Sequence, residues 1–209
     1  MAELESLLND LANLDAQHDL DGLRRVRERI VEEYPDSDAA VEALYKLGLD
    51  LLFRSRDIEQ AVVKFVEAAK RKHVFWSAAA RTSLGLCYYH QKRNQKALLE
   101  LRKVAYAEPP TSHSITALGF IEQIFSNEGN LQEIERVRKD RISQLRRILK
   151  AGKEAGITAA ERGFHLYNLG LALKDAGEEE EAVQSLQTAK ALGPDALGAD
   201  LYRSVVEAL

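Results

Sequence analysis

The chain has 209 residues, of which 45% are apolar, 30% charged and 7% aromatic, and its formal net charge is −4. One cysteine excludes a disulfide scaffold and any multi-cysteine zinc or iron–sulfur site. The negative charge argues against bulk attraction to nucleic acid or anionic lipid. With 4 prolines and 12 glycines, the composition favours helices over other structure.

The first residues carry neither a basic segment nor an apolar segment of the kind found in secretory leaders. The longest apolar runs, such as Leu51-Leu52-Phe53, are far shorter than the roughly 20 residues that span a bilayer. We therefore expect a cytoplasmic protein without membrane insertion.

Charge is unevenly distributed along the chain. Residues 1–35 have a net charge of −5, residues 36–153 of +7 and residues 154–209 of −6. Three interpretations remain open: an ordinary solvated helix surface, an electropositive patch for an acidic protein, and head-to-tail self-association of acidic ends with the basic middle.

Apolar residues recur at helical spacing along nearly the whole chain. The pattern predicts a helix over 4–16, one over 20–34 that Tyr34-Pro35 ends, and a third over 39–55 after capping oxygens at 36–38. Further helices are predicted at about 61–69, 76–91, 94–107, 112–127, 130–151, 159–176, 178–191 and 196–208. The short connections predict antiparallel neighbours and an all-α fold.

Two segments share the same internal spacing. In each, a Leu-Gly pair (Gly85 or Gly170) is followed 12 residues later by an alanine, 4 further by a leucine, and 24 residues after the glycine by a proline. Glycine lets a second helix cross close to the first, and the alanine lies where paired helices approach most closely. Weaker copies begin at Leu47-Gly48 and Leu118-Gly119, and Ile134 replaces the expected alanine in the latter.

This pattern resembles the tetratricopeptide repeat, a helix–turn–helix unit of 34 residues. The resemblance implies a single domain over 1–209 with an α-α superhelix and capping helices. Its parts are a helix pair or degenerate repeat at 1–35, repeats at 39–71, 77–109 and 158–193, an irregular repeat with a long second helix at 112–151, and a terminal capping helix at 195–209. The bridge between the last two repeats, Ala151 to Ile157, is predicted to be a linker. The Tyr34-Pro35-Asp36-Ser37 segment before the Gly48 repeat favours a bacterial origin.

In this family the first helices of the pairs line a concave face that binds partners. The corresponding positions form an apolar and aromatic groove: Tyr45, Leu49, Phe53, Thr82, Leu86, Tyr89, His90, Phe120, Phe164 and Tyr167. These residue types predict no carboxylate clamp, and they suit an amphipathic helix or an extended apolar segment. The alternatives are that a terminal helix of this chain fills the groove, or that some of these residues are core. Trp76 is interpreted as part of an apolar junction between repeats, with an exposed binding residue as the alternative.

The long helix at 130–151 is rich in basic residues. A solvated face is one interpretation, and a docking surface for an acidic partner is the other, formed by Arg136, Lys139, Arg146, Arg147 and Lys150. Nucleic acid is not expected as a partner, because no aromatic residues are interleaved with this charge.

No catalytic motif is recognisable in the sequence. The five histidines do not pair with each other or with Cys87 at metal-ligand spacing, and there is no phosphate loop or nucleophile elbow. Cys87 is predicted to be a buried apolar residue. We expect no enzyme, no cofactor and no metal. The hypotheses are an adaptor that binds another protein or peptide, a self-assembling scaffold, and a sensor of peptides or small ligands.

Overall fold

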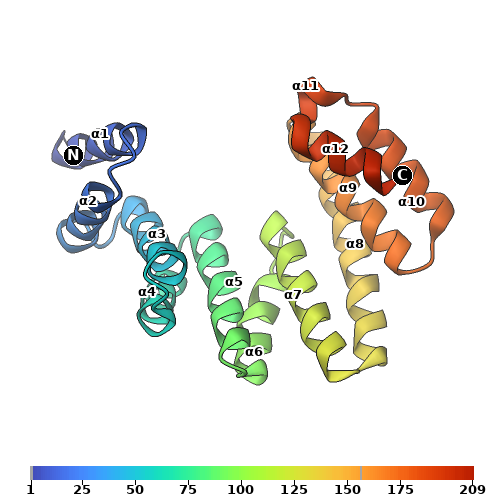
Figure 1. Ribbon diagram of the computed structural model, residues 1–209, viewed down its shortest axis with the longest axis horizontal. Helices are drawn as coiled ribbons and strands as arrows, with labels where there is room; N and C mark the ends of the chain where they lie inside the picture. The colour runs from blue at the N-terminus through green and yellow to red at the C-terminus, as the bar shows by residue number, and fades with distance from the viewer. Residues whose placement is uncertain (1, 156) are drawn as a thin grey trace. The chain divides into compact units, whose positions relative to one another are not determined.

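A computed structural model describes residues 2–155 and 157–209, and within these residues every regular element is a helix (Figure 1). The helices are α1 (Ala2–Ala16), α2 (Leu20–Glu33), α3 (Asp38–Phe53), α4 (Ile58–Lys70), α5 (Val74–His90), α6 (Asn94–Ala105), α7 (Ser112–Glu128), α8 (Leu131–Ala155), α9 (Ala159–Asp175), α10 (Glu179–Lys190), α11 (Pro194–Leu197) and α12 (Ala199–Ala208). The prediction of an all-α fold is confirmed.

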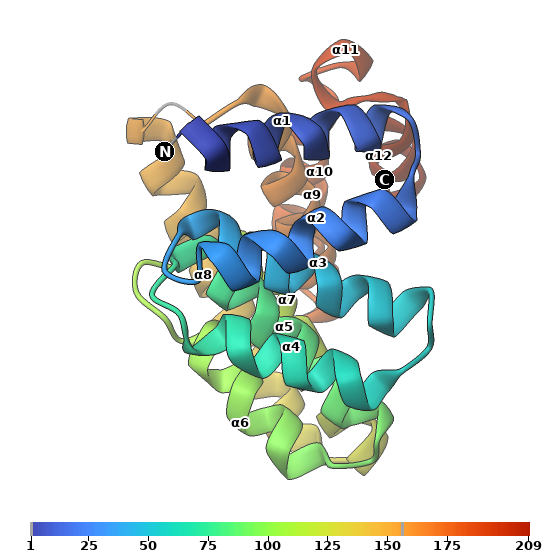
Figure 2. The same cartoon turned by 90° about the vertical axis from the view of Figure 1, so that its left-hand side faces the viewer.

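The chain forms two compact units, residues 1–104 and residues 105–209. In the first unit, consecutive helices are joined by short turns and run antiparallel, as α1 and α2 show in Figure 2. Its core is built around Leu44, Ala61 and Phe65, all 0% exposed. In the second unit, Leu145, Leu173 and Leu186 are equally buried.

Side-chain caps fix several helix starts. Asp19, Ser37, Asp57 and Thr158 each accept a hydrogen bond from a backbone N–H in the first turn of the helix that follows. The prediction of capping oxygens at 36–38 is confirmed by Ser37, whose Oγ accepts from the Ala40 N–H at 3.1 Å.

The turn inside each helix pair contains one residue with a positive φ. These residues are His18, Arg56, Lys92, Gly129 and Gly177, with φ between 55° and 78°. The shared turn geometry shows that α1 and α2 form a helix pair of the same kind as the four that follow. Residues 2–33 therefore contain the helices α1 and α2 as a pair, and their role as a cap or as a degenerate repeat stays a prediction.

Close packing at glycine distinguishes three of the pairs. A Cβ built at Gly48, Gly85 or Gly170 would lie 2.5–2.6 Å from a side-chain carbon of Phe65, Leu101 or Leu186 on the second helix of the same pair. The alanines four residues before these partners, at 61, 97 and 182, are 0% exposed. The sequence argument for close helix crossing is confirmed in these three pairs.

The α7/α8 pair departs from this geometry. A Cβ at Gly119 would meet nothing within 4 Å, so no side chain of α8 packs against this glycine. Ile134 occupies the alanine position, and Arg138 stands four residues later, where the other pairs have Phe or Leu. Arg138 and Arg141 instead donate to Glu122 on α7, at 2.6 and 2.9 Å.

Two predicted boundaries are wrong. The segment from Ala151 was expected to be a linker, but α8 continues to Ala155, because its Ala, Lys and Glu residues are good helix formers; Gly156 lies outside the described residues. The helix expected at 196–208 is divided into α11 and α12 at Gly198, whose φ of 77° is incompatible with a continuous α-helix. Across the described residues, no helix combines the length and the apolar character needed to cross a membrane.

Candidate protein-binding surface

A pocket of about 320 Å³ lies between the first three helices of the first unit. Small residues leave this space open, because Ala12 on α1 stands opposite Ala39 and Ala43 on α3. The lining comprises Leu8, Leu11, Ala12 and Asp15 from α1, Leu23 and Arg27 from α2, and Ala39, Glu42, Ala43 and Lys46 from α3. The size is at the lower end of the roughly 300–1,000 Å³ range of ligand pockets, enough for one or two large side chains.

The pocket is apolar at its base and carries four charged side chains. Leu23 and Ala43 are 3% and 2% exposed. Arg27 is half-buried, and its burial lowers the pKa of the guanidinium, an effect that the charges of Asp15, Asp50 and Glu42 partly offset. The pocket can therefore accept an apolar group together with a charged one.

Aromatic side chains continue this surface from α3 onto α5. The Nζ atom of Lys46 lies 5.6 Å from the centroid of the Trp76 ring, close enough for a cation–π interaction. The Trp76 ring lies 5.5 Å from that of Tyr45, and Phe75 packs edge-on against it at 4.7 Å. Phe75 and Val74 are 52% and 82% exposed, so α5 begins with apolar side chains in contact with solvent.

Lys46 thus belongs both to the pocket and to the aromatic group. We call the continuous surface the α1–α3–α5 strip and define it by Leu8, Arg27, Glu42, Lys46, Phe75 and Trp76. Large apolar side chains that remain exposed next to a pocket are typical of interaction sites.

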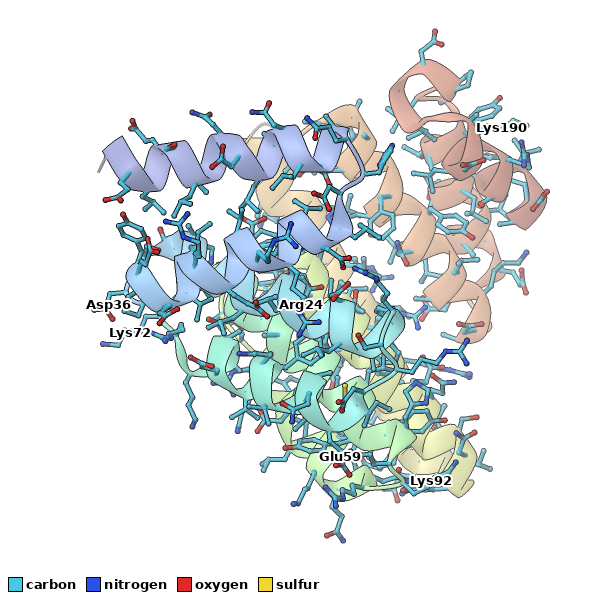
Figure 3. The ribbon with its side chains drawn as sticks, turned by 60° about the vertical axis from the view of Figure 1, so that its left-hand side comes forward. Arg24, Asp36, Glu59, Lys72, Lys92 and Lys190 are labelled. Carbon is cyan, nitrogen blue, oxygen red and sulfur yellow. The ribbon has the colours of Figure 1, made fainter. Side chains whose placement is uncertain are left out.

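The strip begins beside two turns that are tied together. The Arg71 guanidinium donates to the Pro35 carbonyl at 2.7 Å and so joins the turn before α5 to the turn before α3; Lys72 and Asp36, labelled in Figure 3, mark these two turns. The His73 side chain caps α5, accepting from the Trp76 N–H at 3.1 Å through Nδ1. These bonds hold the start of α5, and with it Phe75 and Trp76, against the first unit.

The predicted groove residues of the first unit have different environments. Tyr45 and Leu49 are half-buried against the core, and Phe53 is 69% exposed at the end of α3. Thr82 is 7% exposed, and its hydroxyl donates to the Ala78 carbonyl. Of the remaining residues, Leu86 and Tyr89 are half-buried and His90 is exposed.

In the second unit, the terminal helix covers part of the predicted groove. Tyr167 packs in a cluster with Leu201, Tyr202 and the buried Val205 of α12. Lys174, two turns further along α9, donates to the Ala208 carbonyl at 2.8 Å. Of the other two residues predicted here, Phe120 is half-buried and Phe164 is 45% exposed.

The basic residues of α8 have acidic partners within the second unit. Arg146 bonds Glu181 on α10 at 2.7 Å, and Arg147 bonds Glu108 at 2.6 Å. Arg136 and Lys139 pair with Glu133 and Glu135 of α8 itself, and Lys150 is exposed. Of these pairs, Arg146–Glu181 joins the basic middle of the sequence to its acidic end, and the others lie within the middle.

The potential metal ligands of the described residues are dispersed. Within it, no three His, Cys, Asp or Glu side chains are grouped so as to hold a metal ion. Cys87 is 0% exposed, and burial raises the pKa of its thiol to about 11, so the prediction of a buried, unreactive cysteine is confirmed.

Part of the chain matches a known protein family. The family model of the tetratricopeptide repeat matches residues 166–195, which include Gly170, Ala182 and Leu186. Residues 166–195, which span most of α9 and all of α10, thus match a tetratricopeptide repeat. No curated protein sequence matches it significantly.

Solved structures share the fold of this chain at low sequence identity. MamA is 19% identical, with a TM-score of 0.51 over 92% of this chain and 93% of its own. PilW, a type IV pilus biogenesis factor, is 16% identical, with a TM-score of 0.54 over 96% and 81%. The nearly identical TPR-like repeats of a Podosopora anserina protein are 12% identical, with a TM-score of 0.53 over 94% and 97%. At these identities the likeness concerns the fold alone.

Sequence reasoning missed most of the α1–α3–α5 strip. Arg27 lies on a second helix, whereas the predicted groove used first helices alone. Trp76 was interpreted as a junction residue with an exposed binding residue as the alternative, and the VFW run that contains it was the signal for both. The pocket itself could not be read from a linear pattern, because three helices from two repeats form it.

Proposed function

We propose that this protein is a non-enzymatic adaptor that binds a segment of another protein along the α1–α3–α5 strip. The observation that carries the proposal is the continuity of the strip: a pocket with an apolar base joins an exposed aromatic group through one lysine. A surface with two apolar anchor points suits a segment rather than a small metabolite.

Covering the apolar side chains of this surface would stabilise a complex. Phe75 and Leu8 are 52% and 42% exposed, and covering them in a complex would remove apolar area from water at about 25 cal/mol per Å². The pocket between them is already formed, so a partner would lose little free energy to rearrangement of this chain. The tetratricopeptide-repeat fold supports the same role, because stacked helix pairs present extended surfaces to partners.

The test compares three tagged forms of the chain in a lysate of the organism that encodes it. These are the wild type, the double variant Leu8→Ser/Phe75→Ser, and a control, Val63→Ser/Leu99→Ser, which removes two side chains that are 55% and 59% exposed on α4 and α6. Retained proteins are quantified by mass spectrometry, and direct binding is then measured with the purified partner by calorimetry.

We expect a partner that the wild type and the control retain and that the double variant loses, with unchanged circular dichroism for all three. Identical retention by all three forms would disprove binding along the strip. Retention of this chain alone would instead favour the self-assembling scaffold, and light scattering would then measure its oligomeric state.

A further inference from the structure

The arginines of α2 differ in whether they form an ion pair with an acidic side chain. Arg24 bonds Glu28 and Arg29 bonds Glu33, each at 3.0 Å and one helical turn apart. Arg27 has Leu23 and Val31 at the equivalent positions, so the helix offers it no acidic partner. Among the described residues, Arg27 makes no hydrogen bond and no ion pair within 4.0 Å, although it is less exposed than either neighbour.

The half-buried guanidinium of Arg27 has donors that no protein acceptor occupies among the described residues, so a ligand can take the place of water there. Arginine carries five N–H donors in a planar arrangement that fits both oxygens of a carboxylate. Burial has already removed part of the water around Arg27, and it lowers the pKa of the group. An added carboxylate would therefore gain more at Arg27 than at a fully hydrated surface arginine.

The other charges of the pocket determine the sign of the favoured ligand. Lys46 is also half-buried, and among the described residues its Nζ atom interacts with the Trp76 ring rather than with an acid. Asp15 and Glu42 are exposed, so water satisfies them and an incoming cation would gain little there. The two less hydrated groups are both cationic, and they favour a negative group in the pocket.

We propose that the pocket recognises the side-chain carboxylate of an Asp or Glu that lies next to an aliphatic residue in a partner segment. Arg27 binds the carboxylate, Lys46 adds a second positive charge, and the aliphatic side chain fills the space over Leu23 and Ala43. A carboxylate clamp is formed by residues on the first helices of the pairs. Arg27 lies instead on α2, the second helix of its pair. The inference rests on the proposed function and specifies the partner's chemistry.

The experiment uses a displayed library of random 16-residue peptides, each joined to the coat protein through its C-terminus. This arrangement removes the free terminal carboxylate, so any acidic preference reports an internal side chain. Peptides are selected on the full chain. The selected peptide is then synthesised with an amidated C-terminus, in acidic form and with its Asp or Glu changed to Asn or Gln.

Dissociation constants of both peptides are measured by fluorescence polarisation against the wild type, Arg27→Gln, Arg27→Lys and the control Arg24→Gln; Arg24 is labelled in Figure 3. We expect Arg27→Gln to weaken the acidic peptide about 10- to 100-fold and to leave the amide peptide nearly unchanged. Arg27→Lys should weaken it less, because the charge remains, and Arg24→Gln should have no effect. Circular dichroism checks that each variant is folded.

The outcomes separate this inference from the proposed function. Selected peptides that lack an acidic residue, or that bind Arg27→Gln as tightly as the wild type, would overturn the role of Arg27 while leaving an adaptor in place. The synthetic peptides are also compared with and without amidation of the C-terminus. Binding that needs only the free C-terminal carboxylate would equally overturn the role of Arg27. A selection that enriches no peptide dependent on Leu8 or Phe75 would overturn both.

Discussion

The helix pairs α7/α8 and α9/α10 belong to the same unit and solve the same packing problem in different ways. In α9/α10, Gly170 lets Leu186 approach its Cα, and Ala182 is fully buried between the helices. In α7/α8, the glycine is free of contact, and Glu122 bonds Arg138 and Arg141 across the pair. Close apolar crossing in one pair is replaced by a charged clamp in the other.

The difference explains why the α7/α8 pair diverges from the repeat pattern. The repeat spacing reflects a crossing where a glycine, an alanine and a large apolar residue fit together. Once ion pairs hold the helices, the alanine position can be Ile134 and the apolar position can be Arg138. The clamp also extends to α9, since Arg138 donates to the Asp175 carbonyl at 2.9 Å.

The largest expected effect is at Leu186. Replacing it by alanine should leave a cavity beneath Gly170 and lower the free energy of unfolding by about 2–5 kcal/mol. Far-UV circular dichroism in urea measures the loss. The fluorescence of Trp76, the one tryptophan of the chain, reports the first unit separately. Val183→Ala on the same helix is the control, and an equal loss there would show that α9/α10 has no special crossing.

Removing the carboxylate charge of Glu122 should lower the free energy of unfolding nearly as much as the change at Leu186. Glu122 is 12% exposed at its side chain and Arg141 is 14% exposed, so Glu122→Gln would leave Arg138 without a carboxylate and Arg141 with only Asp175, at 3.8 Å. We expect a loss of about 3 kcal/mol. Glu135→Gln, in a pair with both side chains at least 70% exposed, should change stability by less than about 0.5 kcal/mol. Equal small effects in urea denaturation would show that the clamp does not hold the α7/α8 pair together.

A methyl group at Gly170 should also be harmful. The added Cβ would lie 2.6 Å from Leu186 Cγ and 3.3 Å from the Ala182 carbonyl oxygen, so the helices would have to separate. We expect Gly170→Ala to cost about 1–3 kcal/mol. A melting temperature equal to that of the wild type would mean that α10 moves away without a penalty.

The same change at Gly119 should have the opposite sign. Nothing lies within 4 Å of the added Cβ, and alanine is the better helix former by about 0.5–1 kcal/mol. Gly119→Ala should therefore raise the free energy of unfolding by up to that amount. A destabilised variant would contradict the open packing of this glycine.

The smallest change is expected from pH. Burial lowers the pKa of His165 on α9 and of His113 on α7, so folding favours their neutral forms. The unfolded chain takes up protons first as pH falls below about 6.5, and the second unit should lose stability from there downward through the folded-state pKa values. Urea midpoints followed by circular dichroism between pH 7.5 and 5 should show this, and His165→Leu should flatten the profile. A His165→Leu profile as steep as that of the wild type would assign the dependence elsewhere.

The regular repeats could be predicted from the sequence because their packing requires particular residue types at a fixed local spacing. Gly85 and Ala97, or Gly170 and Ala182, stand at fixed spacing since each pair must cross at one small residue. The charged clamp could not be predicted, because the sequence positions of Glu122 and Arg138 do not distinguish a buried ion pair from a solvent-exposed one. The break at Gly198 was missed because glycine tolerates helical and non-helical φ alike.

The candidate binding site was predicted less well than the fold. Tyr45, Leu49 and Thr82 were correctly placed on first helices, yet they lie partly or fully against the core. Arg27 was not recognised, and for Trp76 the sequence left a junction residue and a binding residue as alternatives, because the exposure of both depends on how α1, α2, α3 and α5 pack together. A site residue in a repeat protein is defined by neighbours from other repeats, which spacing within one repeat does not describe.

By itself the sequence determined the helices, their pairing and the glycine crossings of three pairs, because these follow from periodicity and from contacts within about 35 residues. Tertiary structure alone decided which charges are paired, which aromatic side chains stay exposed, and where the pocket opens. Those properties depend on distances between residues of different pairs. Arg146 bonds Glu181, 35 residues away, while Arg27 forms no ion pair within 4.0 Å among the described residues, although Asp15, Asp50 and Glu42 lie near enough for their charges to act on it.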